Sequence, residues 1–110
     1  MSQYVSNVRT VEFLEVGVKE VVRIKHPPNS RSLKHNHGRS YGFTVVVSGE
    51  VYEICYDLTE TPMEVIHRQG EWFMETPGTI HVVGSVQGAE TLHFYFPPIT
   101  GTMTTYDEDE

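Results

Sequence analysis

The apolar residues of this chain alternate with polar ones at a period of two, and this pattern constrains its fold more than any other feature. In a β-strand such alternation places one face on the core and the other towards solvent. Glycine and proline signals separate the alternating segments about every eight to twelve residues, as in an all-β sandwich or barrel. We therefore expect strands and no helix, at 11–16, 18–25, 43–47, 51–58, 63–67, 72–74, 80–83 and 91–96.

Two further features describe the expected domain. Ser48 and Gly49 lie between two of the segments and predict the turn of a hairpin. A closed or jelly-roll arrangement leaves few exposed edges on a sheet protein of this size. With 110 residues, 38% of them apolar, the chain has room for one domain with one core. We expect residues 1–110 to form it, with the acidic stretch at about 103–110 as a disordered, solvated tail.

Charge and composition exclude several classes of partner. The formal net charge is −7, whereas a nucleic-acid surface needs a basic footprint. No apolar run is long enough to span a bilayer, and no apolar leader opens the sequence. The single cysteine, Cys55, allows no intramolecular disulfide, which fits a reducing compartment. We expect a cytoplasmic protein that binds neither nucleic acid nor membranes.

The histidine pair His35 and His37 is the first candidate for a site. Side chains two residues apart on a strand point to the same face, so two imidazoles there can converge on one ion. Neutral imidazole is a common ligand for iron, zinc, copper and nickel. The pair on its own therefore suggests metal binding without establishing it.

The glycines, proline and histidine that follow this pair give the pattern its specificity. Together with the pair they resemble the two motifs of the cupin superfamily, in the residues His35, His37, Gly49, Gly70, Pro77, Gly78 and His81. The resemblance implies a single-domain double-stranded β-helix, that is, a jelly-roll β-barrel. It also implies a mononuclear metal centre held by His35, His37 and His81.

The chain departs from the cupin pattern at one position. Many cupins have a glutamate as the fourth ligand, where this chain has Tyr41 or Gly42. Three neutral imidazoles leave a divalent ion with its full charge and with open positions. Such a site favours an anionic, soft ligand such as a thiolate and keeps room for dioxygen.

Within the cupins the sequence is similar to the cysteine dioxygenases and related thiol dioxygenases. Gly42 matches the glycine of many bacterial members, where animal enzymes carry a cysteine that is cross-linked to tyrosine. Thr91, His93 and Tyr95 match the family's Ser-x-His-x-Tyr relay before a double proline, with threonine in place of serine. Because these three residues alternate on one strand, we expect them on one face.

The resemblance also implies roles for these side chains. Tyr95, oriented by His93 and Thr91, would position the substrate carboxylate and the reacting oxygen, and an arginine from an early strand would hold that carboxylate. Arg9 is the first candidate for this arginine, and Arg23 and Arg39 are the alternatives. The competing interpretation makes Tyr95 and His93 ordinary core residues and the arginines surface residues.

The function implied by the resemblance is oxidation of a small thiol, such as cysteine, to its sulfinate by dioxygen at a ferrous ion. Nickel, zinc and manganese fit the same ligands. Small cupins commonly form homodimers, and the resemblance suggests one here. Two alternatives stay open: a metal cupin of another class, such as an isomerase or lyase, and a non-catalytic ligand-binding cupin.

Several other polar residues are not expected at the metal. His26 precedes two prolines and is expected in a loop, and His67 is expected at the surface end of a strand. In the predicted strand registers Glu50, Glu53 and Glu75 do not approach the ion.

Overall fold

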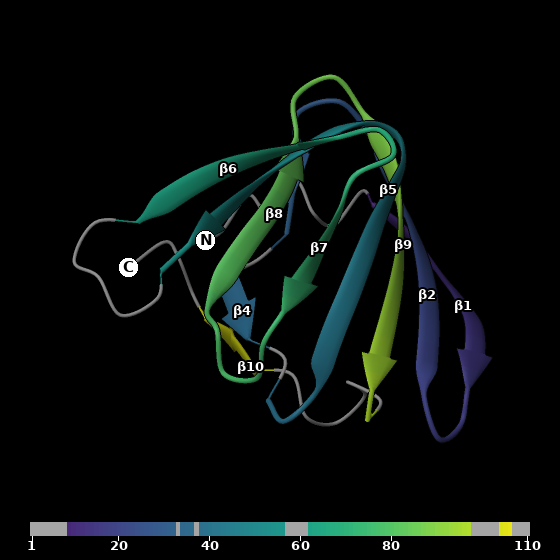
Figure 1. Ribbon diagram of the computed structural model, residues 1–110. Helices are drawn as coiled ribbons and strands as arrows, with labels where there is room; N and C mark the ends of the chain where they lie inside the picture. Colours follow the sequence, from purple (N-terminus) through teal and green to yellow (C-terminus); the bar gives the residue numbers. More distant parts are fainter. Residues whose placement is uncertain (1–8, 33, 37, 57–61, 98–103, 107–110) are drawn as a thin grey trace.

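The computed structural model describes residues 9–32, 34–36, 38–56, 62–97 and 104–106, the last three by their backbone alone. Ten β-strands, and no helix, make up the regular structure of this part of the chain (Figure 1). Their bounds are β1 (Thr10–Val16), β2 (Glu20–His26), β3 (Ser30–Arg31), β4 (Lys34–Asn36), β5 (Tyr41–Cys55), β6 (Met63–Arg68), β7 (Trp72–Glu75), β8 (His81–Ser85), β9 (Ala89–Phe96) and β10 (Thr104–Tyr106).

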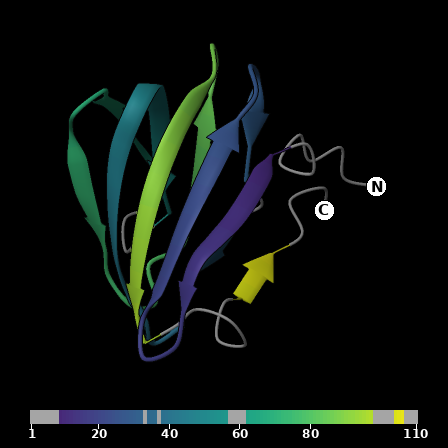
Figure 2. The ribbon, with the colours of Figure 1, turned by 90° about the vertical axis from the view of Figure 1, so that its right-hand side faces the viewer.

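The strands form two walls of one curled antiparallel sheet. One wall has the order β1-β2-β9-β5-β7, and Figure 2 shows β1, β2, β9 and β5 side by side in it. The other wall has the order β6-β5-β8-β4-β10, and β3 also pairs with β8. The two walls share β5, which closes the sheet into a jelly roll. The all-β prediction is confirmed.

The hairpin predicted at Ser48 and Gly49 is wrong, because β5 continues through both residues. Its first half pairs with β9 and β7, and its second half pairs with β6 and β8. A register shift between Val46 and Ser48 marks a bulge, where the strand bends from one wall into the other. Gly49 has φ 78°, and a Cβ there would lie 2.3 Å from the carbonyl oxygen of Gly88. The glycine therefore permits a close approach of two backbones instead of a turn.

The barrel interior is unusually polar. Among the described residues, two small clusters of buried apolar side chains are present, one of Val46, Val51, Phe73 and Val83, the other of Val22, Ile24 and Tyr95. The buried polar side chains are more numerous: Glu20, His26, Ser30, Ser32, His35, Ser40, Thr44, Glu53, Glu75, His81, Ser85, Thr91 and His93. Burying polar groups destabilises a fold unless they are hydrogen-bonded. An interior of this kind suits a binding site better than it suits a packed core.

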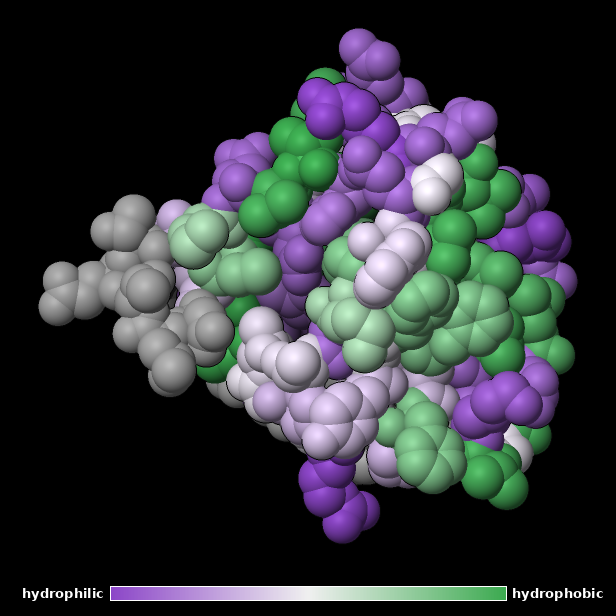
Figure 3. All heavy atoms as spheres, in the orientation of Figure 1, coloured by the Kyte–Doolittle hydropathy of each residue, from purple (hydrophilic) through white to green (hydrophobic). Residues whose placement is uncertain are grey.

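The outer face over β5, β7 and β9 is apolar (Figure 3). Tyr41, Trp72, Met74 and Phe96 are each more than half exposed there, and Trp72 stacks on Phe43 with ring centroids 5.1 Å apart. Trp72 therefore lies outside the core, whereas its neighbour Phe73 is part of it. The homodimer that the sequence suggests stays a prediction.

The end of the chain contains one further strand. β10 pairs antiparallel with β4, in a stretch that the sequence assigns to a solvated tail. Residues 103 and 107–110 lie outside the described residues, so the tail stays a prediction for them. In the part of the chain that the structure describes, there is no helix with the length and apolar character to cross a membrane.

Candidate metal centre and active site

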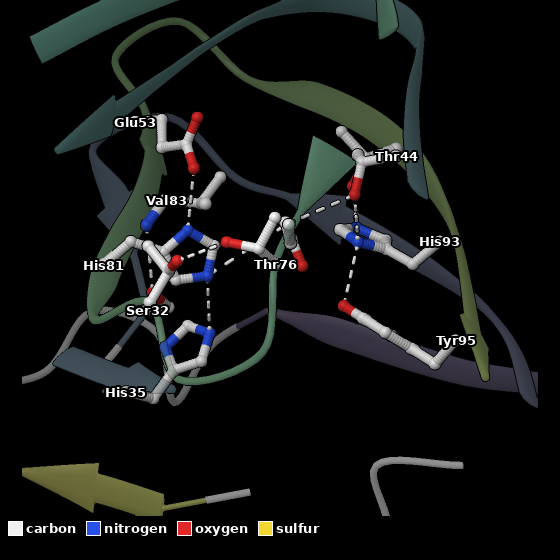
Figure 4. A network of polar contacts seen from close by, with 12 residues as sticks. Ser32, His35, Thr44, Glu53, Thr76, His81, Val83, His93 and Tyr95 are labelled. Carbon is white, nitrogen blue, oxygen red and sulfur yellow. Dashed lines mark hydrogen bonds and ion pairs between the residues drawn. The ribbon is translucent and has the colours of Figure 1, made fainter. Parts of the chain in front are cut away.

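Two of the three predicted metal ligands meet inside the barrel. His35 on β4 and His81 on β8 are paired residues of the second wall, and both are buried. Their Nε2 atoms lie 3.1 Å apart, and the rings are inclined at 60° (Figure 4). Two nitrogen ligands, each about 2.0–2.1 Å from a shared ion, lie about 3.0–3.4 Å apart. The spacing of the two imidazoles therefore fits a common metal ion.

The third predicted ligand, His37, lies outside the described residues. Within the described ranges, no three His, Cys, Asp or Glu side chains are already arranged to hold an ion. The described part of the predicted site is thus the pair His35 and His81.

Glu53 orients the His81 ring. The Nδ1–H of His81 donates to Oε2 of Glu53 at 2.9 Å, and Oε1 accepts from Nε2 of His67 at 3.0 Å. Burial by itself would raise the pKa of the Glu53 carboxyl, but the hydrogen bonds from His81 and His67 outweigh it and lower the pKa. An ionised Glu53 fixes the Nδ1–H tautomer of His81, so that its Nε2 lone pair faces His35. Carboxylates fix metal-binding histidines in this way.

His67 is not the surface residue that the sequence predicts. Its ring stacks on Phe73 with centroids 3.9 Å apart, in addition to its hydrogen bond to Glu53. Glu53 lies on the same inward face of β5 as buried Val51. The alternation of the strand could therefore have predicted that Glu53 points into the barrel.

The predicted relay residues also come together on the inward face of β9, and Figure 4 shows two of them, His93 and Tyr95. Thr91 Oγ1 lies 2.7 Å from His93 Nε2, and His93 Nδ1 lies 3.1 Å from the Tyr95 hydroxyl. All three side chains are buried. Their order matches the sequence prediction of hydroxyl, imidazole and phenol.

His26 extends this relay by one residue. It is the last residue of β2 and is buried, so the predicted loop position is wrong. Its Nε2 lies 2.8 Å from Thr91 Oγ1, and its Nδ1 is buried with no hydrogen-bond partner among the described residues. Burial first, and then electrostatic interaction with Arg9 and His93, lowers its pKa to about 3, which keeps the imidazole neutral.

A carboxylate at the other end sets the direction of the hydrogen bonds. Thr44 Oγ1 donates to Glu75 Oε2 at 3.3 Å, and it can then only accept from His93 Nδ1, which lies 2.9 Å away. With its proton on Nδ1, His93 accepts at Nε2 from the Thr91 hydroxyl. Thr91 in turn accepts from His26 Nε2, and this leaves His26 Nδ1 without a proton to donate. One tautomer of each imidazole satisfies the whole chain.

Tyr95 also contacts this carboxylate. Burial first, and then the charge of Glu75 and a hydrogen bond to it, raises the pKa of Tyr95 well above its ordinary value. The phenol therefore keeps its proton at neutral pH and donates it in the hydrogen bond to Glu75.

Of the three candidate arginines, Arg9 is the one that faces this cluster. It interacts electrostatically with Tyr95 and His26, burial lowers its pKa, and its buried Nε has no hydrogen-bond partner among the described residues. Arg23 instead pairs with Glu12 at 2.7 Å on the outside of the sheet, and Arg39 is exposed in a turn.

Glu75 is a second carboxylate that the sequence interpretation placed wrongly. It is buried at the end of β7, and its Oε2 lies 4.0 Å from His81 Nε2. One carboxylate thus lies between the imidazole pair and the relay, since it also contacts Thr44 and Tyr95. Phe73 and Glu75 lie on the same face of β7. A prediction that placed Phe73, and not Trp72, in the core would therefore also have placed Glu75 inside the barrel.

Replacing Thr91 by valine should destabilise the fold, because the isosteric side chain cannot bond to either imidazole. His26 and His93 would each lose a buried partner, at about 1–3 kcal/mol per unsatisfied group. Urea unfolding of the variant measures the loss. The matched control is Thr10→Val on exposed β1, which should stay within about 0.5 kcal/mol of the parent protein. Equal stabilities would contradict the hydrogen-bond chain.

Comparison with solved structures identifies the fold. A Klebsiella pneumoniae protein with a double-stranded β-helix domain superposes with a TM-score of 0.76 and 14% identity, over 91% of this chain and 85% of its own. Recombinant oxalate oxidase in complex with glycolate gives 0.77 and 18% over 90% of this chain, which spans only 55% of the oxidase chain. KdgF from Halomonas sp. gives 0.70 and 14%, over 81% and 80% of the two chains.

Identities this low show the fold alone. The chain has the double-stranded β-helix fold of the cupins, as its sequence predicts. No protein-family model matches the sequence.

Proposed function

We propose that this cupin-fold protein is a metal-dependent dioxygenase that oxidises a small thiol, such as cysteine, to its sulfinate. The observation that carries the proposal is the buried relay of Thr91, His93 and Tyr95, adjacent to the pair His35 and His81. The reaction R–SH + O2 → R–SO2H places both oxygen atoms on sulfur and needs no external reductant. It therefore requires no binding site for a second cofactor.

The metal centre is proposed from the donors themselves. His35 and His81, with His37 as the third imidazole, would hold a ferrous ion, and other divalent ions fit the same set. When bound, the ion would hold thiolate and dioxygen in one coordination sphere, so that a bimolecular reaction becomes effectively unimolecular.

The side chains around the ion bind and orient the substrate. Arg9 would hold the carboxylate of an amino-acid thiol, and its buried guanidinium makes such a charge-assisted bond stronger than one in water. Tyr95, protonated and held by His93, would turn its hydrogen bond from Glu75 to the substrate or the reacting oxygen. Thr91 and His26 act through His93 and are positioning residues.

The test is anaerobic loading with ferrous iron, followed by oxygen uptake with a panel of small thiols and identification of products by mass spectrometry. Tyr95→Phe removes the donor and keeps the ring, and it should lower the rate of sulfinate formation about 10²-fold or more. Tyr41→Phe is the matched control, because Tyr41 is exposed on the outer face. Iron-loaded protein that consumes no oxygen with any thiol would refute the proposal.

A second candidate is a metal cupin of another class, such as an isomerase or lyase. The observation that favours it is Glu75, whose carboxylate lies 4.0 Å from His81. A negative charge beside the imidazoles lowers the preference of a bound ion for thiolate and raises it for neutral or oxygen-donor ligands. Metal-loaded protein that binds oxygen-donor acids but oxidises no thiol would favour this class.

A further inference from the structure

We propose that Glu75 supplies the carboxylate of the metal site, from β7, in place of the glutamate that cupins carry at the position of Gly42 on β5. The inference rests on the metal centre of the proposed function, and it stands whether or not the substrate is a thiol.

The strand register places Glu75 in the position that it would need. Gly42 and Glu75 are directly paired residues of the antiparallel strands β5 and β7. Directly paired residues project on the same side of a sheet, and both positions here face the barrel interior. A carboxylate on β7 can therefore serve the same space as a carboxylate on β5.

The space itself is occupied by Glu75. A Cβ built on Gly42 would lie 2.8 Å from Oε1 of Glu75 and 3.1 Å from its Cβ. Atoms this close overlap, so a side chain at residue 42 and the present conformation of Glu75 exclude one another. Because Gly42 has no side chain, it leaves the space that the Glu75 carboxylate occupies from the neighbouring strand.

The two distances from His81 lie within the reach of a shared ion, although the three side chains are not yet arranged around one. Two ligand atoms that are each about 2.1 Å from one ion can be at most about 4.2 Å apart. Nε2 of His81 lies 3.1 Å from Nε2 of His35 and 4.0 Å from Oε2 of Glu75, so both pairs are within this limit. Thr44 and Tyr95 hydrogen-bond to the carboxylate and hold it between the relay and the imidazoles.

The charge of this carboxylate should strengthen metal binding. Histidines alone are neutral ligands, and a divalent ion in a water-poor interior is stabilised by an anionic one. The isosteric change Glu75→Gln removes the charge and keeps the shape. It should weaken the affinity for Co2+ and Zn2+ by at least about tenfold.

The experiment measures affinity by competition with a chromophoric chelator, starting from protein stripped of metal. The visible spectrum of bound Co2+ is recorded as well, because it reports the set of ligands directly. Glu50→Gln is the matched control, since it removes the same charge from an exposed side chain of β5. That variant should stay within about twofold of the parent affinity, because solvent and salt screen its charge.

A swap variant tests the position as well as the charge. Gly42→Glu combined with Glu75→Gly returns the carboxylate to β5 and removes its clash with Glu75, although Tyr95 Cε1 at 2.9 Å must shift. Thermal melting establishes whether each variant is folded. A folded swap variant should bind Co2+ more tightly than Glu75→Gln does.

The outcomes separate this inference from the proposed function. Weaker binding and a changed Co2+ spectrum in Glu75→Gln support the inference, even if no thiol is oxidised. Unchanged affinity and spectrum in folded Glu75→Gln overturn it, even if thiols are oxidised. Parent protein that binds no divalent ion overturns both the inference and the metal centre.

Discussion

His81→Ala is expected to lower the affinity for divalent metal ions by more than about a hundredfold. Residues that only orient a metal-binding histidine already contribute about 10–100-fold, and His81 presents its own Nε2 to the site. Removing it also leaves His35 without the second nitrogen 3.1 Å away. Chelator competition with Co2+ measures the affinity, and sulfinate formation should disappear with it.

His67→Ala is the control that makes this result specific. His67 bonds to the same carboxylate, Glu53, at nearly the same distance, but its ring stacks on Phe73 instead of facing His35. Loss of an imidazole beside Glu53 is thus common to both variants, and only His81→Ala loses a proposed ligand. We expect His67→Ala to keep metal binding within about 10–100-fold, the range for residues that act through another ligand. Equal losses in both variants would contradict the assignment of His81.

The second large effect expected is acid destabilisation through His26, in metal-free protein. Its pKa is lowered from 6.5 to about 3 in the folded state, chiefly by burial. Below pH 6.5 the unfolded chain therefore binds a proton that the folded protein excludes, and stability falls as the pH falls. The loss is about 2–3 kcal/mol between pH 6.5 and 4.5, and on the order of 3–5 kcal/mol by pH 3.

Two other groups with shifted pKa values, His81 and Glu53, contribute little to the slope between pH 4.5 and 6.5. The raised pKa of His81 contributes stability that is complete below pH 6.5 and is lost only above it. The lowered pKa of Glu53 contributes stability that is lost only as the pH falls below 4.5. His26 should contribute a slope of about 1.4 kcal/mol per pH unit across this window, measured as the difference between urea unfolding of the parent protein and of His26→Gln. The same slope in His26→Gln would rule out His26 as its source.

Much of the fold could be predicted from the sequence, because a period of two leaves few alternatives to antiparallel strands. The relay positions followed from the same period, since Thr91, His93 and Tyr95 share one face whatever the strand pairs with. The prediction of a hairpin was wrong because Ser48 and Gly49 are equally compatible with a turn and with a bent strand. Which of the two forms depends on Gly88, a residue far along the chain.

The carboxylates of the site were missed for a related reason. Glu53 and Glu75 are charged, and charged side chains are seldom buried without partners. Their partners are histidines and hydroxyl groups on other strands. The hydrogen bonds that offset the free-energy cost of burying each carboxylate therefore cannot be predicted from the sequence of one strand. His26 was missed in the same way, because Thr91, its partner, lies 65 residues away in the chain.

Strand β5 also has a consequence for how the barrel acquires its site during folding. It pairs with β6, β7, β8 and β9, and it carries Thr44 in one wall and Glu53 in the other. A slip of one residue in its pairing would turn both side chains to the outer surface together. The two halves of the site should therefore form in a single cooperative step, and a partly folded barrel would hold neither.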